Sequence, residues 1–479
     1  MNNATPLYEA LQQYVKQSKN ALHMPGHKQG KAVPTIYKND IFEMDLTELP
    51  ELDNLHVPEG PILKAQQMAA KAFGARESFF LVNGASCGLQ AMITATCMPG
   101  DEIIIDRNCH AAVFSALILT GVIPRYIYPA YNKELGVIGG ICPNDIKQAL
   151  QQYPKAKAVL ITCPTYHGIC SDIKQIAQIV HQHQKVLLVD EAHGAHFCFH
   201  SKLPISAMEA GADMCVQGAH KTLPALTQSA LLHINHTQSV NVERIKSALK
   251  LFQTTSPSFI LMTYLDIARH IMEQQGQQKL ERVICTANNI RDDLNQKDYI
   301  YCIDRKVIGK DNIYDVDATR FTVHFHNGTR TGYEVAKILN QKFNIQVEMA
   351  DIYNIVCILS VGDYKKDLKD LCRAIKQLKS NIGGVQKRIS AVPPKSLYAV
   401  STREAYFADT HQIPLKQAEG SISATVVSCY PPCIPILCPG ELITREIIAY
   451  IYKMHACSAK ITGLKENFSI RVIRHNQGT

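Results

Sequence analysis

Between residues 78 and 234 the chain alternates short, nearly continuous apolar runs with longer amphipathic stretches. Seven runs have this character: "SFFLVN", "DEIIID", "IPRYIYP", "AVLITCP", "KVLLVDEA", "MCVQGAH" and "SALLHI". Strands that are apolar on both faces and separated by helices are typical of a mostly parallel sheet with helices on both sides. The pattern therefore predicts an α/β domain, with helices over 88–98, 110–121 and 172–184.

The order of elements changes after residue 240. Residues 241–295 are mainly helical, and residues 317–380 predict a compact α+β unit of strand, helix, two strands and helix. Its last helix, "YKKDLKDLCRAIKQLKS", places Leu368, Leu371, Ile375 and Leu378 on one face. A chain of 479 residues exceeds the usual size of one core. We expect three domains, 1–300, 301–390 and 391–479, with a linker over 380–397 and a surface helix at the start of the chain.

Composition and charge exclude several classes of function. The chain has 50 Lys and Arg against 42 Asp and Glu, and this excess of +8 is dispersed, which does not favour nucleic-acid binding. No apolar run is long enough to span a membrane, and the polar start does not resemble a signal peptide, so we expect a cytoplasmic protein. Among 16 cysteines only Cys429, Cys433 and Cys438 cluster. A metal site there is the weaker alternative to reduced thiols packed as small hydrophobes.

In a parallel sheet the ligand lies beyond the carboxyl ends of the strands, so the residues that follow each run are the candidates for chemistry. After "SFFLVN" comes "GASCG" (84–88), a turn and helix start whose backbone N–H groups can bind an anion, with the Ser86 hydroxyl beside them. A tight structural turn is the alternative. His110 follows "DEIIID". It either caps a helix or lays its flat ring over an aromatic cofactor.

Two further runs end in charged groups. Asp190 and His193 follow "KVLLV", and His220 and Lys221 follow "MCVQGA". A buried aspartate needs a cation or several donors, and a buried ammonium costs several kcal/mol, so the lysine either reaches water or is used chemically. An anion cradle, a flat ring, a carboxylate and an amine together suit pyridoxal 5'-phosphate, with Lys221 as its Schiff-base amine.

Motifs along nearly the whole chain carry a resemblance to a known family. They include "HMPGHKQG", "FFLVNGAS", "DRNCH", "VDEAHGAHF", "HKTLPALTQSALLH", "TTSPSFILM" and "YPPCIPILCPGELIT". In this order they resemble the ornithine/lysine/arginine decarboxylases of the fold-type I pyridoxal-phosphate enzymes, in the short form without an N-terminal wing. The resemblance implies a seven-stranded, mostly parallel sheet in a large domain, followed by smaller α+β domains.

The resemblance also implies roles for individual residues. Lys221 matches the Schiff-base lysine, Asp190 the partner of the pyridine nitrogen and His110 the ring stacked on the cofactor. His193 and His220 match active-site positions of the same motifs. Phosphate contacts match Ala85 and Ser86 and, from a second copy of the chain, Ser256 in "TTSPS". The family forms obligate dimers in which each subunit completes the other's site, so a homodimer is implied.

The chain departs from the family pattern at several positions near the phosphate. The family usually has Thr or Ser where this chain has Ala85, and Ser-Thr where it has Gly218 and Ala219. Ala111 and Ala112 replace Lys-Ser, and Cys433 replaces glycine. Each lost charge-assisted hydrogen bond is worth about 1.5–3 kcal/mol. The departures predict weaker cofactor binding than the family norm, and impaired catalysis.

The function implied is decarboxylation of arginine, lysine or ornithine to agmatine or a diamine, a step of polyamine metabolism, without metal. Lys221 or His220 is the candidate acid that protonates the product carbon. A carboxylate is expected to bind the distal cation of the substrate. Glu441 is the first candidate, although a capping role would explain it equally, and Asp45, Glu48 and Asp53 are further candidates.

Two rival interpretations remain open on the sequence. One is a different pyridoxal-phosphate reaction, such as aminotransfer or aldol cleavage, in which Arg403 of "STREA" binds the substrate carboxylate. The other is a decayed paralogue that dimerises and binds cofactor without turnover, which the altered phosphate positions favour.

Overall fold

Seven strands form the central sheet of the computed structural model, which describes residues 16, 20–23, 25–38, 44–49, 52–326, 330–378, 394–430, 434–457 and 459–474. The strand order is β2-β11-β10-β9-β7-β3-β4. All strands run parallel except β11, which is antiparallel to both neighbours. Their bounds are β2 Glu77–Leu81, β3 Glu102–Asp106, β4 Ile123–Ile127, β7 Ala158–Thr162, β9 Val186–Asp190, β10 Met214–Gln217 and β11 Ala230–Ile234. Each strand arises from one predicted apolar run, which confirms the α/β fold.

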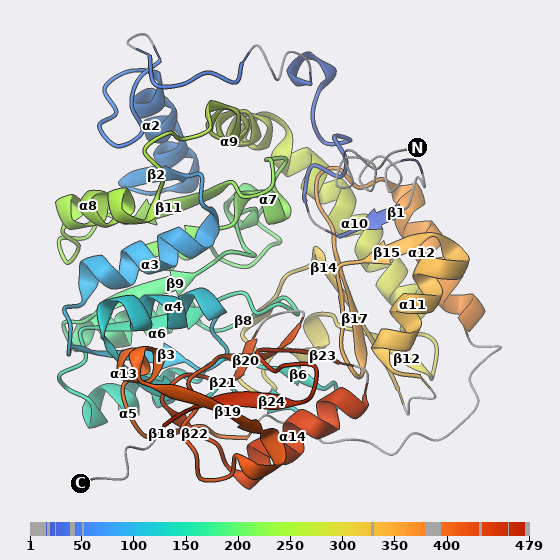
Figure 1. Cartoon of the computed structure of the whole chain (residues 1–479). Helices are drawn as coiled ribbons and strands as arrows, with labels where there is room; N and C mark the ends of the chain where they lie inside the picture. Colours follow the sequence, from blue (N-terminus) through green and yellow to red (C-terminus); the bar gives the residue numbers. More distant parts are fainter. Residues whose placement is uncertain are drawn as a thin grey trace, which may run out of the picture.

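Helices cover both faces of this sheet, as the doubly apolar strands require (Figure 1). Consecutive residues of β7 show why: Ala158 and Leu160 belong to one core cluster, and Val159 and Ile161 to the other. One face is covered by α3 (Gly84–Thr96), α4 (Ala111–Thr120) and α8 (Val242–Phe252), the other by α2 (Pro61–Phe73), α5 (Pro143–Gln152), α6 (Ile173–Gln182) and α9 (Phe259–Ile271). The helix expected from residue 88 begins four residues earlier, because the "GASCG" turn is itself the first helical turn.

Close packing of α3 on the sheet depends on Gly88. A Cβ atom at this position would lie 2.6 Å from Cγ2 of Val216 and 2.8 Å from Cδ1 of Leu81. The backbone of α3 therefore approaches β10 more closely than any residue with a side chain allows. This contact fixes the start of α3 near the end of β10.

A four-stranded sheet with the order β12-β14-β17-β16 lies beside the central sheet. Its strands are β12 Ile300–Cys302, β14 Arg320–Phe325, β16 Met349–Ala350 and β17 Asn354–Ile358, and it packs against α10 (Gln277–Leu294), α11 (Gly332–Phe343) and α12 (Lys365–Gln377). The predicted apolar face of α12 is buried. Where the sequence predicts two strands the chain forms three, because the short β15 (Ile345–Val347) pairs with β1 (Asn20–Leu22) instead.

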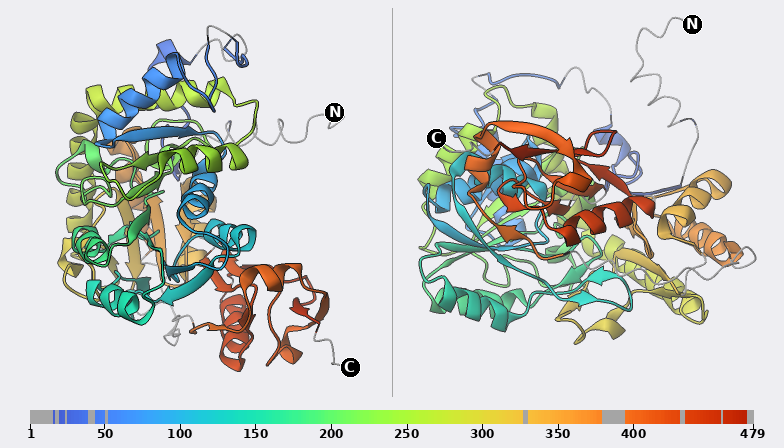
Figure 2. Two further views of the ribbon diagram at one scale, coloured as in Figure 1. Left: turned by 90° about the vertical axis from the view of Figure 1, so that its left-hand side faces the viewer. Right: turned by 60° about the horizontal axis from the view of Figure 1, so that its bottom comes forward.

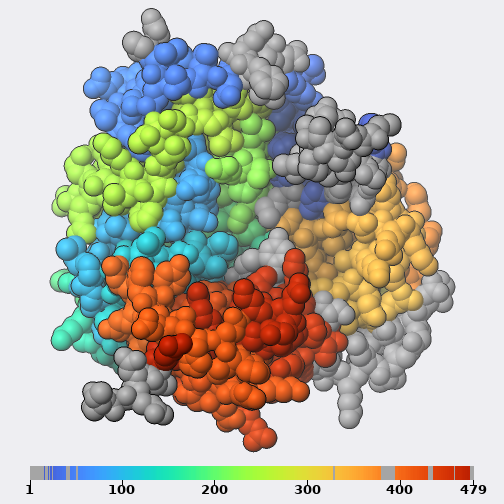
Figure 3. Space-filling model, in the orientation of Figure 1, coloured from blue at the N-terminus to red at the C-terminus, as the bar shows by residue number. Residues whose placement is uncertain are grey.

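The last part of the chain folds around a separate small core (Figures 2 and 3). Its elements are β18 Leu397–Tyr398, α13 Thr402–Phe407, β19 Thr410–Pro414, β20 Val427–Tyr430, β21 Ile434–Leu437, β22 Glu441–Leu442, α14 Arg445–Ala456, β23 Lys460–Thr462 and β24 Ser469–Ile473. In Figure 1 it lies below α4. The three domain boundaries stay a prediction. Residues 380–393 of the expected linker and residues 1–15 of the expected surface helix lie outside the described residues.

Within the described part of the chain, every helix is too short or too polar to traverse a bilayer.

A chain of buried hydrogen bonds crosses three strands of the central sheet and ends at Glu191, directly after β9. Ser78 on β2 contacts the His233 ring on β11 at 2.7 Å, and the other ring nitrogen lies 3.1 Å from Oε1 of Gln217 on β10. The Gln217 amide then donates to Glu191 at 2.7 Å. Burial raises the pKa of Glu191 to about 8. The hydrogen bonds from Gln217 and from the Ala207 amide lower this pKa, but they offset the effect of burial only in part. The folded protein therefore holds a protonated carboxyl directly after β9.

We expect Glu191 to make the protein less stable as pH rises. Its folded pKa of about 8 lies above the unfolded value of 4.5, so its contribution is fully present below pH 4.5 and is lost as pH rises toward 8. Each pKa unit corresponds to about 1.4 kcal/mol. In urea titrations between pH 5 and 8, Glu191→Gln should lose less free energy of unfolding than the wild type. The exposed Glu243→Gln is the control, and equal slopes for all three proteins would contradict the interpretation.

Candidate active site

The predicted site residues meet at the carboxyl edge of the central sheet. Asp190 is the last residue of β9 and pairs with Val216 of β10 on one side and Thr162 of β7 on the other. Lys221 lies in α7 (Ala219–Thr222), directly after β10, and His110 follows β3. The shared edge is what brings residues more than 100 positions apart together.

Lys221 is the centre of this cluster. Its Nζ lies 3.1 Å from Nε2 of His193. Burial lowers the pKa of Lys221; Asp190 opposes this shift, and the positive charge of Arg320 adds to it. Gly218 makes room for the lysine side chain, because a Cβ there would lie 3.0 Å from Cδ of Lys221 and 2.8 Å from the Ala192 carbonyl oxygen. The surroundings of Lys221 therefore favour the neutral amine more than water does.

The hydrogen bonds of His193 lead to the same conclusion independently. Nη2 of Arg320 donates to Nδ1 of His193 at 3.1 Å. Arginine cannot act as an acceptor, so Nδ1 must be the unprotonated nitrogen and the ring proton is on Nε2. That proton is then donated to Nζ of Lys221, which can accept it only as a neutral amine. Burial and the nearby cations lower the pKa of His193 far below its usual value, so the ring stays neutral.

Arg320 is a functional residue that the sequence analysis missed. It is the first residue of β14, and its side chain is almost fully buried, with 1% exposed. Nε and Nη1 make no hydrogen bond to the described residues. The guanidinium also lies 6.0 Å over the Tyr166 ring, which packs edge-on to His193 at 4.6 Å between ring centres. Nothing in "ATRFTV" distinguishes this arginine from a surface residue of a strand.

His110 and Asp190 provide a flat surface and a negative charge beside the lysine. His110 is the N-cap of α4 and accepts from the Ala112 amide through Nδ1, so the capping interpretation is correct. Its ring is nevertheless exposed. The protein around the rest of the ring lowers the pKa of His110, whereas Asp190 opposes that shift. Asp190 is 3% exposed, and its Oδ1 accepts from the Ala192 amide.

The N-terminus of α3 has the features of an anion site. Asn83 precedes the helix, but its side chain makes no capping bond among the described residues and donates instead to the Phe252 carbonyl. Gly84 has a φ of 73°, which only glycine adopts at little cost. The first N–H groups of α3 therefore remain available beside Ser86. Ala85 packs partly into the core below.

The "HMPGHKQG" motif holds α7 in place. The Gly26 amide donates to the His220 carbonyl at 2.8 Å, and a Cβ on Gly26 would lie 2.6 Å from the Leu223 carbonyl oxygen. Lys28 next to it is buried and bonds the Ile358 carbonyl at 2.7 Å. Nδ1 of His220 lies 3.0 Å from the Ser229 carbonyl and must donate to it, which leaves Nε2 as the basic nitrogen.

A second unpredicted residue, Glu348, adds an acidic group. It lies between β15 and β16 and accepts a hydrogen bond from the Tyr166 hydroxyl. Its carboxylate acts electrostatically on both Lys221 and His220, opposing the lowering of their pKa values. In the sequence it resembles an ordinary polar residue at a strand end.

Glu441, the first candidate for substrate binding, has a different role in the structure. It is fully buried, and its carboxylate forms an ion pair with Arg107 at 3.1 Å and accepts from the Cys438 amide. Arg107 also donates to the Pro435 carbonyl. The pair joins the C-terminal part to the loop after β3 through Oε2, and Oε1 has no hydrogen-bond partner among the described residues. Glu441 therefore forms a buried ion pair, and its substrate contact stays a prediction.

The remaining candidates are also engaged elsewhere. The Asp53 carboxylate accepts from backbone amides, including Glu59 and Gly60, at the start of α2. Glu48 accepts from Asn54 and Leu55. Arg403 donates to backbone carbonyls at the end of α4. Within the described part of the chain, no hydrogen bond or ion pair connects Asp45 to the Lys221 cluster.

Two expectations, for Ser256 and for Cys433, stay predictions. Residues 254–256 are exposed, and Ser256 does not contact the Lys221 cluster of its own chain, so its predicted contact with a neighbouring subunit stays a prediction. Cys433 lies outside the described residues. Among the residues that are described, no group of three His, Cys, Asp or Glu side chains is arranged to hold a metal ion.

Comparisons with known proteins match the chain along nearly its whole length. Residues 5–367 match the model of the Orn/Lys/Arg decarboxylase major domain, and residues 386–478 that of the C-terminal domain. The chain is 39% identical to the arginine decarboxylase of Bacillus subtilis (strain 168), over 99% of this chain and 98% of that protein. It is 36% identical to the arginine decarboxylase of Bacillus anthracis, over 98% and 97%. The solved constitutive lysine decarboxylase of Escherichia coli has a TM-score of 0.79 and 21% identity, covering 98% of this chain and 82% of that chain.

We expect Arg320→Met to raise the pKa of Lys221, because it removes both a nearby cation and the donor that fixes the His193 tautomer. The pKa can be measured from the pH dependence of Lys221 labelling by an aldehyde and borohydride, followed by peptide mass mapping. Arg320→Lys keeps a donor and should shift it less.

Arg269→Met is the control for this experiment, since Arg269 is a buried arginine that pairs with Asp266 and Glu273. An unchanged labelling profile in Arg320→Met would show that Arg320 does not set the state of the lysine.

Proposed function

The chain belongs to the Orn/Lys/Arg decarboxylase family, and from this premise we propose that it binds pyridoxal 5'-phosphate at Lys221 and decarboxylates arginine to agmatine. Decarboxylation of a basic amino acid follows from the family and from the curated relatives. Arginine is proposed because the relatives named arginine decarboxylase are 35–39% identical to this chain, whereas the lysine decarboxylase LdcA of Pseudomonas aeruginosa is 25% identical.

The hydrogen-bond chain from Arg320 through His193 to Lys221 is the observation that carries the proposal. An aldehyde reacts with a neutral amine and not with an ammonium, and the Arg320–His193–Lys221 hydrogen bonds specify the neutral form. The other groups of the cofactor also find counterparts. The exposed His110 ring suits stacking, the buried Asp190 carboxylate suits a protonated ring nitrogen, and the open start of α3 with Ser86 suits a phosphate.

Pyridoxal phosphate, when bound, accepts the electron pair that the departing carbon dioxide leaves on the α-carbon. The protein's own groups hold the charges around this reaction. Asp190 supplies a fixed negative charge, and His193 keeps a proton on Nε2 directed at Nζ of Lys221. Lys221 or His220 remains the candidate to deliver a proton to the product carbon. Nε2 of His220 is its free basic nitrogen, and the Glu348 carboxylate favours the protonated ring.

Glu348 replaces Glu441 as our candidate for attracting the cationic substrate. It is half-buried at the Lys221 cluster, whereas Glu441 is neutralised by Arg107. A carboxylate facing the site lowers the energy of a guanidinium or ammonium group there. We further propose a cytoplasmic homodimer that acts in polyamine metabolism, with Ser256 of each subunit reaching the phosphate site of the other. The exposure of residues 254–256 supports this arrangement.

Lys221→Ala should abolish turnover, because no other amine in the described cluster can take its place. Purified protein with added pyridoxal phosphate is incubated separately with arginine, lysine and ornithine, and carbon dioxide and amine are measured. The wild type should release agmatine fastest. Lys202→Ala, which changes a surface lysine paired with Glu281, is the control. Agmatine formation above the uncatalysed background by Lys221→Ala would disprove the assignment, and preference for lysine or ornithine would disprove the substrate.

Glu348→Gln and Glu441→Gln should have different effects, because Glu348 is expected to attract the substrate and Glu441 to stabilise the fold through its ion pair with Arg107. Loss of the Glu348 charge should raise KM for arginine about tenfold with little change in the free energy of unfolding. Loss of the Glu441 charge leaves Arg107 buried without its counter-ion and should cost about 3–5 kcal/mol of stability. Steady-state kinetics and urea unfolding measure the two effects. A rise in KM for Glu441→Gln alone would restore the original assignment.

A further inference from the structure

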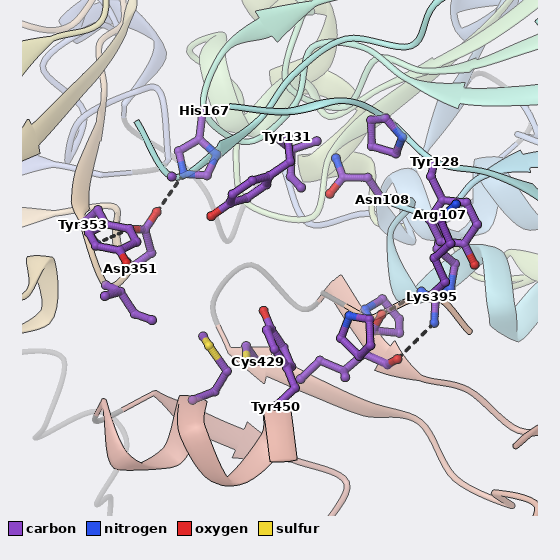
Figure 4. A pocket seen from close by; sticks show the side chains of 18 of the residues that line it. Arg107, Asn108, Tyr128, Tyr131, His167, Asp351, Tyr353, Lys395, Cys429 and Tyr450 are labelled. Atoms are coloured by element: carbon purple, nitrogen blue, oxygen red, sulfur yellow. Dashed lines mark hydrogen bonds and ion pairs between the residues drawn. The ribbon is translucent and has the colours of Figure 1, made fainter. Parts of the chain in front are cut away.

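A cavity of about 310 Å³ lies where the central sheet, the four-stranded sheet and the C-terminal part meet (Figure 4). Its walls include Arg107 and Tyr131 from the large part, Asp351 from the loop after β16, and Lys395 and Tyr450 from the C-terminal part. Lys221, His193, His110, Asp190 and Arg320 do not line it. Its volume is within the range of small-molecule sites.

One end of the cavity is an aromatic cage with a carboxylate. Asp351 lies beside Tyr131, Tyr333 and Tyr450, and its negative charge adds to burial in raising the pKa of each of these tyrosines. The carboxylate is 24% exposed, and Nε2 of His167 lies 2.9 Å from Oδ2. Its Oδ1 accepts from the backbone amides of Tyr353 and Asn354, which fix its position. Tyrosine faces around a carboxylate attract ammonium and guanidinium groups.

The other end carries a positive charge. Lys395 lies 5.4 Å over the Tyr128 ring, and no acidic group in the described part of the chain pairs with it. Arg107 beside it is neutralised by Glu441. Figure 4 shows Lys395 and Arg107 on the side of the cavity opposite Asp351 and Tyr353, with Tyr131 and Tyr450 between. A ligand that fills the cavity therefore meets a negative charge at one end and a positive charge at the other.

We propose that this cavity is a second ligand site, separate from Lys221, for a free basic amino acid. Its guanidinium or ammonium side chain occupies the tyrosine cage at Asp351, and its carboxylate faces Lys395. A diamine or agmatine would place a second cation against Lys395, so these molecules fit poorly. The choice of arginine as the probe rests on the proposed function, whereas the site itself rests on the charges and shape of the cavity.

The cavity walls lead directly to the Lys221 cluster. His167 follows Tyr166, whose ring packs on His193, and Asn108 precedes His110 by two residues. A ligand held between the three parts of the chain would fix both of these segments. Binding is therefore expected to stabilise the fold as well as to occupy the cavity.

The test is isothermal titration calorimetry of arginine and of agmatine into the full chain carrying Lys221→Ala with pyridoxal phosphate, which prevents turnover. Arginine should bind with two equivalents per chain. Adding Lys395→Ala should weaken one equivalent about tenfold while Glu348→Gln weakens the other, and agmatine affinity should not fall with Lys395→Ala. Lys416→Ala is the matched control, because Lys416 is also stacked over a tyrosine, Tyr452, outside the cavity.

Three results would overturn the proposal. The first is an equal loss of arginine affinity in Lys395→Ala and Lys416→Ala, and the second is a loss of agmatine affinity in Lys395→Ala as large as that of arginine. A single equivalent weakened by both Glu348→Gln and Lys395→Ala would show that the cavity is only the far end of the catalytic site. If the proposed function is wrong, the wild type produces no agmatine. The activity assay detects this result, and the binding experiment does not measure it.

Discussion

The hydrogen bond from Arg320 to His193 is the constraint on which the chemistry of this site depends. A permanently protonated donor on Nδ1 forces the imidazole proton onto Nε2, and that proton then requires an unprotonated Lys221. Burial alone would lower the pKa of the lysine, but it would not determine which nitrogen of His193 carries the ring proton. The arginine comes from β14, so the smaller sheet sets the protonation state of a residue on the central sheet.

The same dependence on distant parts of the chain appears at a second buried contact. Arg107 is the second residue of the "DRNCH" motif, directly after β3, and its charge is balanced by Glu441 of the C-terminal part. Because breaking a buried pair leaves an uncompensated charge, the contact holds the two parts together firmly. Arg107 of this pair also lines the aromatic cavity, which Tyr131, Asp351 and Tyr450 reach from three different parts of the chain.

Gly218 is a departure from the family pattern that the structure relates to the packing of Lys221. A side chain there would press on the Ala192 carbonyl and on the aliphatic part of Lys221, so this chain packs the lysine more closely than a serine would allow. The hydroxyls missing at Ala85, Gly218 and Ala219 still predict weaker phosphate binding. The open helix start at α3 supplies backbone donors that depend on no side chain.

The sequence by itself determined the helices and strands, and it determined the site residues that follow the strands of the central sheet. Apolar runs fixed the seven strands because both faces of a parallel sheet are buried, and the residues at their ends, Asp190, His110 and Lys221, share one edge for the same reason. Only the tertiary structure decided the partners of these residues. Arg320 and Glu441 lie on strands and Glu348 lies between two short ones. The local pattern is the same whether their charges face solvent, a catalytic lysine or a buried arginine. Which of these they face depends on how separately folded sheets pack together, and such long-range contacts leave no periodicity in the chain.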